Sequence, residues 1–199
     1  MPGRVHHWLP LKPSEVGVAL DNAGFDWWIA GGYALELFAG QTWRSHEDID
    51  ILILRPDLPI VLTHFAKWDV WLADPPGHLR SRKSDEFDTK AHDIWLREFG
   101  SASWRLQIMV DEAQDDLWQS RRNPQLRLTR TALGWRHASG LPCLAPQVQL
   151  FYKAKSPRPK DELDRLQVIP MLDDAQRRWL FDAIAKTYGE NHLWLATLT

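Results

Sequence analysis

The sequence of 199 residues has a single cysteine, Cys143, so no disulfide can form within the chain. Its neighbours Pro142 and Leu144 offer neither a basic group nor a metal ligand, which argues against a reactive or metal-binding thiol. We expect Cys143 to be a small buried side chain. A chain of this length can bury most of its apolar surface without disulfides or structural metals.

Long apolar runs are also missing. No segment approaches the ~20 apolar residues of a membrane span, and residues 1–12 lack the apolar stretch of a signal peptide. These absences predict a cytoplasmic protein that has no membrane partner.

The chain has no excess of charge of either sign. It carries 24 Lys and Arg against 26 Asp and Glu, a formal net charge of −2. No overall field would attract a polyanion, so nucleic acid is not an expected partner. A single nucleotide needs only a local basic cluster and stays compatible with this balance.

The first part of the chain alternates strand and helix patterns. The apolar run Trp27 to Ala30, the glycine pair Gly31–Gly32 and the helical spacing of residues 33–39 predict a strand, a turn and a helix. Residues 48–54 alternate and predict a strand, while residues 92–97 and 104–110 predict a hairpin. Residues 73–91 are rich in Pro, Gly and charge and predict a long loop.

The last part of the chain is helical in pattern. Pro146 at a first helical position opens one predicted helix, and two more follow over about 160–168 and 173–188. We therefore predict an α+β fold. Residues 1–144 would form a mixed β-sheet flanked by helices, and residues 145–199 would form a helical region packed on it.

The motif Asp48-Ile49-Asp50 places two carboxylates on one face of a predicted strand, about 7 Å apart at the backbone. Mg²⁺ favours a site of one or two carboxylates completed by water and phosphate oxygens. The upstream Gly31–Gly32 turn leads into a helix whose N-terminus favours an anion. Arg44 and His46 stand between the two elements, where they would contact a triphosphate or order the metal-binding strand. Taken singly, each feature also fits a plain turn or solvated surface charges.

In combined order these elements resemble a known family. The run WWIAGGYALELFAGQTWRSHEDIDILI, residues 27–53, resembles the signature of the nucleotidyltransferase superfamily, and most closely the aminoglycoside and lincosamide nucleotidyltransferase-like proteins. The run LAPQVQLFYKAKSPRPKDELD, residues 144–164, is similar to the family's C-terminal helix and its Arg-Pro-Lys-Asp segment. The resemblance implies a nucleotidyltransferase-like fold and an enzyme that uses Mg²⁺ and a nucleoside triphosphate, with ATP expected.

The resemblance also implies roles for particular residues. Gly31, Gly32 and Arg44 would handle the triphosphate, and Asp48 and Asp50 would hold the metal. Lys153 or Lys155 would contact the nucleotide phosphates or the acceptor. The alternative for the two lysines is a solvated basic helix end, with Asp161 and Asp164 neutralising it through local ion pairs.

One position departs from the family pattern. Members commonly carry a third carboxylate on a neighbouring strand, as general base or metal ligand, but Gln107 stands where we expect it. An amide cannot abstract a proton. Asp111 shares the strand parity of Gln107 and is the favoured substitute, and Asp93 on the preceding strand is a second candidate.

These features predict transfer of a nucleoside monophosphate to a hydroxyl of a small acceptor, one similar to an aminoglycoside or a lincosamide. Because of Gln107, the alternative is a nucleotide-binding module of the same fold without turnover. A sugar-nucleotide glycosyltransferase also uses Asp-x-Asp with a metal, but its chemistry does not require the upstream Gly-Gly helix. The sequence identifies neither the acceptor nor the oligomeric state.

Overall fold

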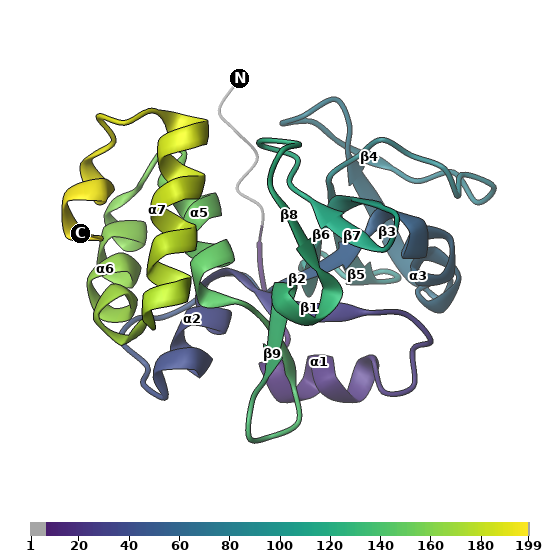
Figure 1. Ribbon diagram of the computed structural model, residues 1–199. Helices are drawn as coiled ribbons and strands as arrows, with labels where there is room; N and C mark the ends of the chain where they lie inside the picture. Colours follow the sequence, from purple (N-terminus) through teal and green to yellow (C-terminus); the bar gives the residue numbers. More distant parts are fainter. Residues whose placement is uncertain (1–6, 199) are drawn as a thin grey trace.

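The computed structural model describes residues 7–198, and a mixed β-sheet with helices on both faces dominates it (Figure 1). The strands in this part of the chain are β1 (Trp27–Ala30), β2 (Asp50–Leu54), β3 (Trp68–Ala73), β4 (Leu79–Ser81), β5 (Asp93–Glu98), β6 (Leu106–Gln114), β7 (Leu117–Gln119), β8 (Arg127–Thr129), β9 (Gly134–Arg136) and β10 (Pro142–Leu144).

The helices are of two kinds. The α-helices are α1 (Pro13–Ala19), α2 (Gly31–Ala39), α3 (Leu58–His64), α4 (Arg130–Leu133), α5 (Pro146–Ala154), α6 (Pro159–Val168) and α7 (Asp174–Tyr188). Three short 3₁₀ segments are η1 (Arg55–Asp57), η2 (Ile169–Met171) and η3 (Leu193–Thr197).

The strands run in the order β4-β3-β5-β6-β2-β1-β10-β9. Two neighbouring pairs are parallel, β2 with β6 and β1 with β10, and the others in this order are antiparallel. A further ribbon leaves the path where β7 pairs with β6 and β8 with β7. The predicted α+β fold with a mixed sheet is confirmed.

Strand β2 sits in the middle of the sheet and divides two cores. Ile49, Ile51 and Ile53 point into one core, while Leu52 and Leu54 point into the other, as the alternation predicts. The strand begins at Asp50, so the prediction that it includes Asp48 is wrong by two residues. The cause is its neighbour β1, which pairs Ala30 with Asp50 and then turns into α2.

Different helices cover the two cores. Helices α1 and α3 bury Val16 and Val61 in the core that contains Ile51. Helices α5 and α7 bury Phe151 and Leu180 in the core on the other side, where the helices α5, α6 and α7 gather (Figure 1). The face of β2 that carries Asp50 and Leu52 is therefore the face toward the C-terminal helices.

Local sequence sets where two of these helices begin and end. Helix α2 ends at Gly40, whose φ of 65° is a left-handed cap that glycine adopts without strain. Helix α7 begins after Asp173, whose side chain accepts a hydrogen bond from the Gln176 backbone, a capping box. Several short strands were missed: β4 lies inside the predicted loop 73–91, and β4, β7, β9 and β10, of three residues each, are too short to show alternation.

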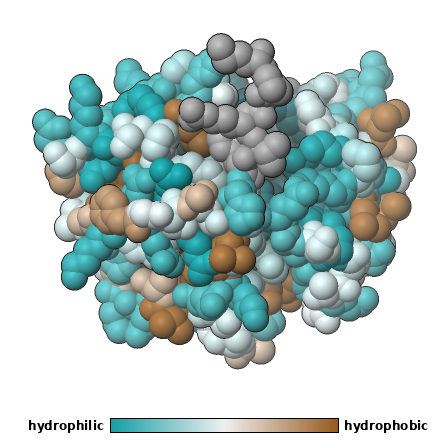
Figure 2. All heavy atoms as spheres, turned by 180° about the vertical axis from the view of Figure 1, so that it is seen from behind, coloured by the Kyte–Doolittle hydropathy of each residue, from teal (hydrophilic) through white to brown (hydrophobic). Residues whose placement is uncertain are grey.

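The surface carries no extended apolar belt on the face in Figure 2, which is mostly hydrophilic with isolated brown patches. Within residues 7–198, no helix has both the length and the apolar character needed to cross a membrane. The last strand, β10, ends at Leu144 and α5 begins at Pro146. The division into residues 1–144 and 145–199 stays a proposal.

Candidate active site

The glycine pair begins α2 directly after β1. Gly31 has a φ of 68°, a conformation that a residue with a Cβ rarely adopts. A Cβ on Gly31 would overlap Oδ2 of Asp50, and one on Gly32 would overlap the guanidinium of Arg44 and the ring of His46. The pair is therefore needed because the side chains of the site approach the backbone here.

The first amide of this helix is already bonded within the protein. The Gly31 N–H donates to Oε1 of Gln149, 2.7 Å away and on α5. Gln149 is buried. The helix start is thus tied to the C-terminal region across 118 residues.

Three carboxylates interact near the start of β2, a central strand of the sheet. Asp48 precedes β2, Asp50 is its first residue, and Asp93 is the first residue of β5. Burial, the charge of Asp48 and, to a smaller extent, the charge of Asp93 raise the pKa of Asp50 to about 7. The charges of Lys153 and Lys160 act in the opposite direction. This concentration of negative charge is what a cation would relieve.

The donor set fits a Mg²⁺ site that the substrate completes. Within residues 7–198, no group of three or more His, Cys, Asp or Glu side chains is arranged to hold a metal ion. The protein offers the carboxylates Asp48 and Asp50, which suits Mg²⁺ because this ion keeps waters and takes phosphate oxygens as further ligands.

Gln107 stands beside these carboxylates on β6. It pairs in register with Asp50 on one side and with Trp95 on the other. Its Nε2 donates to Oδ1 of Asp93, 3.2 Å away. The amide therefore orients a carboxylate that comes from the next strand.

Asp111 lies at the other end of the same strand face and has different partners. It pairs with Leu54, and its side chain is fully buried. Its Oδ2 accepts hydrogen bonds from Trp118 Nε1, 2.6 Å away, and from the Tyr152 hydroxyl. Burial raises its pKa, against these two bonds. A substrate hydroxyl cannot reach this enclosed oxygen without displacing them.

Arg44 and His46 belong to a buried network rather than to an open surface. Arg44 donates through Nε and Nη2 to Asp164 on α6, at 2.8 and 2.9 Å. Its Nη1 lies 3.1 Å from Nδ1 of His46, whose Nε2 lies 2.9 Å from Glu36. The His46 ring stacks on Tyr33 with centroids 4.0 Å apart.

The two lysines differ in environment. Lys153 is nearly buried, and its Nζ lies 2.8 Å from Asp161 and 3.0 Å from Asp164. Lys155 is exposed. The charges of Lys153 and of Lys160 on α6 lower the pKa of Asp50, Lys153 more than Lys160. Arg158, just before α6, is paired with Asp161, and the charges of Asp48 and Asp50 contribute to raising its pKa.

Sequence reasoning missed three residues that contact the site: Glu36, Gln149 and Arg121, whose Nη1 lies 3.6 Å from Asp93. It also missed the long-range contact of Asp164. The Arg158–Asp161 pair is local, as the sequence suggests. The Arg44–Asp164 pair spans 120 residues, so spacing along the chain gave no signal for it.

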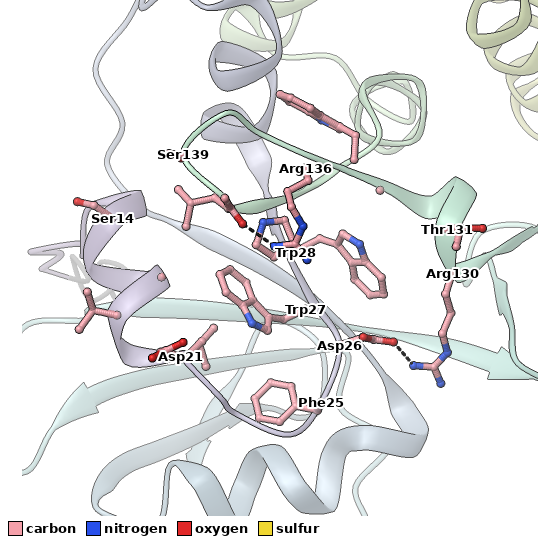
Figure 3. Close-up of a pocket in the computed structure, with 18 residues that line it drawn as sticks. Ser14, Asp21, Phe25, Asp26, Trp27, Trp28, Arg130, Thr131, Arg136 and Ser139 are labelled. Atoms are coloured by element: carbon pink, nitrogen blue, oxygen red, sulfur yellow. Dashed lines mark hydrogen bonds and ion pairs between the residues drawn. The ribbon is translucent and has the colours of Figure 1, made fainter.

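Two cavities lie near the strand that leads into the site. One, of about 690 Å³, is lined by residues that include Tyr33, Arg44 and His46. The other, of about 950 Å³, lies at the start of β1, between α1 and the hairpin of β9 and β10 (Figure 3). Of the residues that line this second cavity, all within the described part of the chain, none is a predicted site residue.

Comparison with known proteins adds to this geometry. A family model described as aminoglycoside-2''-adenylyltransferase matches residues 14–168, a range that contains every predicted site residue. A comparison with curated proteins found no match.

Three solved structures share the fold. The lincomycin-bound lincosamide antibiotic adenylyltransferase LnuA is 15% identical with a TM-score of 0.55, covering 80% of this chain and 95% of that chain. The solution structure of the antibiotic-resistance factor ANT(2'')-Ia is 14% identical with a TM-score of 0.58, covering 88% and 90%. The complex of ANT(2'')-Ia with adenylyl-2''-tobramycin is 14% identical with a TM-score of 0.55, covering 87% and 95%.

Proposed function

Since the chain belongs to the aminoglycoside-2''-adenylyltransferase family, and so is a nucleotidyltransferase, we propose that it moves a nucleoside monophosphate from a Mg²⁺-bound nucleoside triphosphate to an acceptor hydroxyl. The proposed nucleotide is ATP, because the family is named for adenylyl transfer. The proposed acceptor is a small hydroxylated compound of the aminoglycoside or lincosamide class.

The observation that carries the proposal is the group of three carboxylates opposite basic side chains. Asp48 and Asp50 would hold the metal, which supplies charge neutralisation for the triphosphate when it is bound. Lys160 and Arg158, in the α6 region, interact electrostatically with these carboxylates and would contact the phosphates, Arg158 while paired with Asp161. Lys153 is already paired with two carboxylates, so its role would be to order them.

The group that would accept the proton is Asp93. The acceptor oxygen forms a bond to the α-phosphorus, the bond between this phosphorus and the oxygen that bridges to the β-phosphorus breaks, and pyrophosphate leaves. The hydroxyl proton passes to the Asp93 carboxylate. We propose Asp93 rather than Asp111 because Asp93 lies close enough to Asp50 to raise its pKa, whereas both hydrogen bonds of Asp111 are internal.

Arg44 and His46 would act mainly by fixing the start of β2. The Arg44 guanidinium is held by Asp164, and His46 packs between Tyr33 and Glu36. Gly31 and Gly32 would give these side chains and Asp50 the space that they need. Lys155 is exposed at the end of α5, and we propose that it contacts the nucleotide phosphates or the acceptor. Cys143 is a buried free thiol, which fits the cytoplasmic location that we propose.

The alternative function, nucleotide binding without turnover, rested on Gln107. Asp93 weakens that argument because a carboxylate lies within hydrogen-bond distance of the amide. Calorimetry of the four ribonucleoside triphosphates with and without Mg²⁺ tests binding, and pyrophosphate release against a panel of aminoglycosides and lincosamides tests transfer. We expect Mg²⁺-dependent binding and release with at least one acceptor. Binding without release from any acceptor on the panel favours the module, and absence of binding contradicts both functions.

A further inference from the structure

We propose that Arg121 is a positioning residue that holds the Asp93 carboxylate for proton transfer, and that buried Asp111 supports Arg121 from the other side. The proposal rests on the proposed function, because it gives Asp93 the role of general base. It gives a role to Arg121 and Asp111, two charged residues that take no direct part in the proposed transfer reaction.

Arg121 lies between the two carboxylates. Its Nη1 is 3.6 Å from Oδ2 of Asp93, and its Nε is 3.5 Å from Oδ1 of Asp111. The guanidinium also lies 5.7 Å from the ring centre of Tyr152. Only 12% of the Arg121 side chain and none of the Asp111 side chain is exposed, so water screens their contact little, whereas the Asp93 side chain is 34% exposed.

Two of these atoms have no other partner. Arg121 Nε and Asp111 Oδ1 are both buried and make no hydrogen bond in the described structure. The two atoms lie 3.5 Å apart, so a small movement of Arg121 toward Asp111 would form a hydrogen bond between them. Buried polar groups are costly when unpaired, which favours that movement.

Asp111 is a rigid support for this contact. Its other oxygen accepts hydrogen bonds from Trp118 and Tyr152, which fix the carboxylate from β7 and from α5. Arg121 itself follows β7, and the pairing of Glu112 with Gln119 brings that segment back over β6. The ribbon of β7 and β8 thus carries a cation to a place between two acids of the sheet.

Asp93 is then held on both oxygens. Gln107 donates to Oδ1 and Arg121 faces Oδ2. A base held at two points keeps its orientation when the acceptor arrives, and misplacement of a reacting group by about 1 Å can reduce a rate by about 10²-fold. The chain Asp111–Arg121–Asp93 would therefore affect turnover without touching the nucleotide.

Kinetics of a double-mutant cycle test the proposal. The variants are Arg121→Met, Asp93→Asn and the double variant, with Arg121→Lys and Arg121→Gln as milder changes and the exposed neighbour Arg122→Met as a matched control. The assays are pyrophosphate release with one accepted acceptor and calorimetry of the Mg²⁺-nucleotide. Arg121→Gln and Arg121→Lys serve as the test if Arg121→Met does not fold.

We expect Arg121→Met to lower kcat by about 10- to 100-fold and to change the nucleotide Kd by less than about twofold. Arg121→Lys should have a kcat between those of the parent and Arg121→Met, since an ammonium keeps the charge but cannot contact both carboxylates in a fixed fork. In the Asp93→Asn background, Arg121→Met should lower kcat by less than a further factor of about two, because the effects of substitutions at residues that act through one another are not additive. Arg122→Met should match the parent.

Three results overturn the proposal: unchanged kcat, a loss of nucleotide affinity equal to the loss of turnover, or effects that multiply in the double variant. If Asp93→Asn alone keeps the parent turnover, or the parent has none, the role of Asp93 in the proposed function fails. Crystal structures of the parent and Arg121→Met then decide the positioning separately. The Asp93 carboxylate should leave its place beside Gln107, and an unmoved carboxylate contradicts the proposal.

Discussion

Arg44 and Asp164, 120 residues apart in the chain, form a two-point ion pair with N–O distances of 2.8 and 2.9 Å. Asp164 is fully buried; it also accepts one hydrogen bond from Trp43 and forms an ion pair with Lys153. One carboxylate of α6 thus fixes the segment that leads to β2.

Asp164→Asn should destabilise the fold by about 3–5 kcal/mol, because it leaves the nearly buried Arg44 without its counter-charge and Lys153 with Asp161 alone. Burial acts to raise the pKa of Asp164, but the hydrogen bonds and charges of Arg44, Lys153 and Trp43 together outweigh it, and the pKa is lowered. A lowered pKa gives stability that is present above the unfolded value of about 3.9 and lost as pH falls through the folded value. Urea unfolding at pH 7 and near pH 3 measures both effects.

The control is the exposed Asp182→Asn, which should change stability by less than about 0.5 kcal/mol. The difference between parent and Asp164→Asn should shrink in acid. A difference that stays constant with pH would show that the charge of Asp164 is not what stabilises the fold.

Asp50→Asn should abolish Mg²⁺-dependent nucleotide binding while the fold persists. The change removes a charge that Asp48 and Asp93 oppose, so thermal stability should be equal to or above that of the parent. Calorimetry with Mg²⁺-ATP and a thermal melt measure the two outcomes, with the exposed Asp88→Asn as control. Parent-like affinity in a folded Asp50→Asn protein would remove Asp50 from the metal site.

Gly32→Ala should weaken nucleotide binding by at least about tenfold, because even a methyl group would overlap Arg44 and His46 and displace the segment before β2. Gly31→Ala should be worse for folding, since it adds the strain of a φ of 68° to an overlap with Asp50. Calorimetry measures the nucleotide affinity of each variant, and a thermal melt shows whether the variant is as well folded as the parent. If a folded Gly32→Ala protein binds normally, the turn has only a structural role.

Asp93→Asn and Asp111→Asn should have different effects on transfer and on stability. The first should lower transfer by roughly 10²–10⁴-fold, as for a general base, with little change in stability. The second should mainly cost stability, about 1–3 kcal/mol for a disturbed buried network, with a smaller loss of turnover through Arg121. Pyrophosphate release and urea unfolding of both variants decide it. If Asp111→Asn instead shows the larger loss of transfer and Asp93→Asn the larger loss of stability, Asp111 is the general base.

The sequence was sufficient for β2 from Asp50 onward and for the glycines at the start of α2, because alternation and glycine placement are local signals. Alternation wrongly placed Asp48 in the strand, and the metal-binding role of Asp48 and Asp50 stays a prediction. Strand parity alone could not choose between Asp93 and Asp111. Asp111 shares the face of Gln107, but the bulk of α5 and β7 encloses it. Pairings such as Gly31 with Gln149 depend on how the helices pack across the sheet, which no local pattern encodes.

The contacts from α5 and α6 limit how the chain can be recombined. Gln149 bonds the first amide of α2, and Asp164 holds Arg44, so each end of the segment that precedes β2 is anchored in the helical region. An exchange of residues 145–199 with those of a distant relative would need Gln and Asp at these two positions. The two halves of this enzyme are therefore expected to diverge together rather than as interchangeable modules.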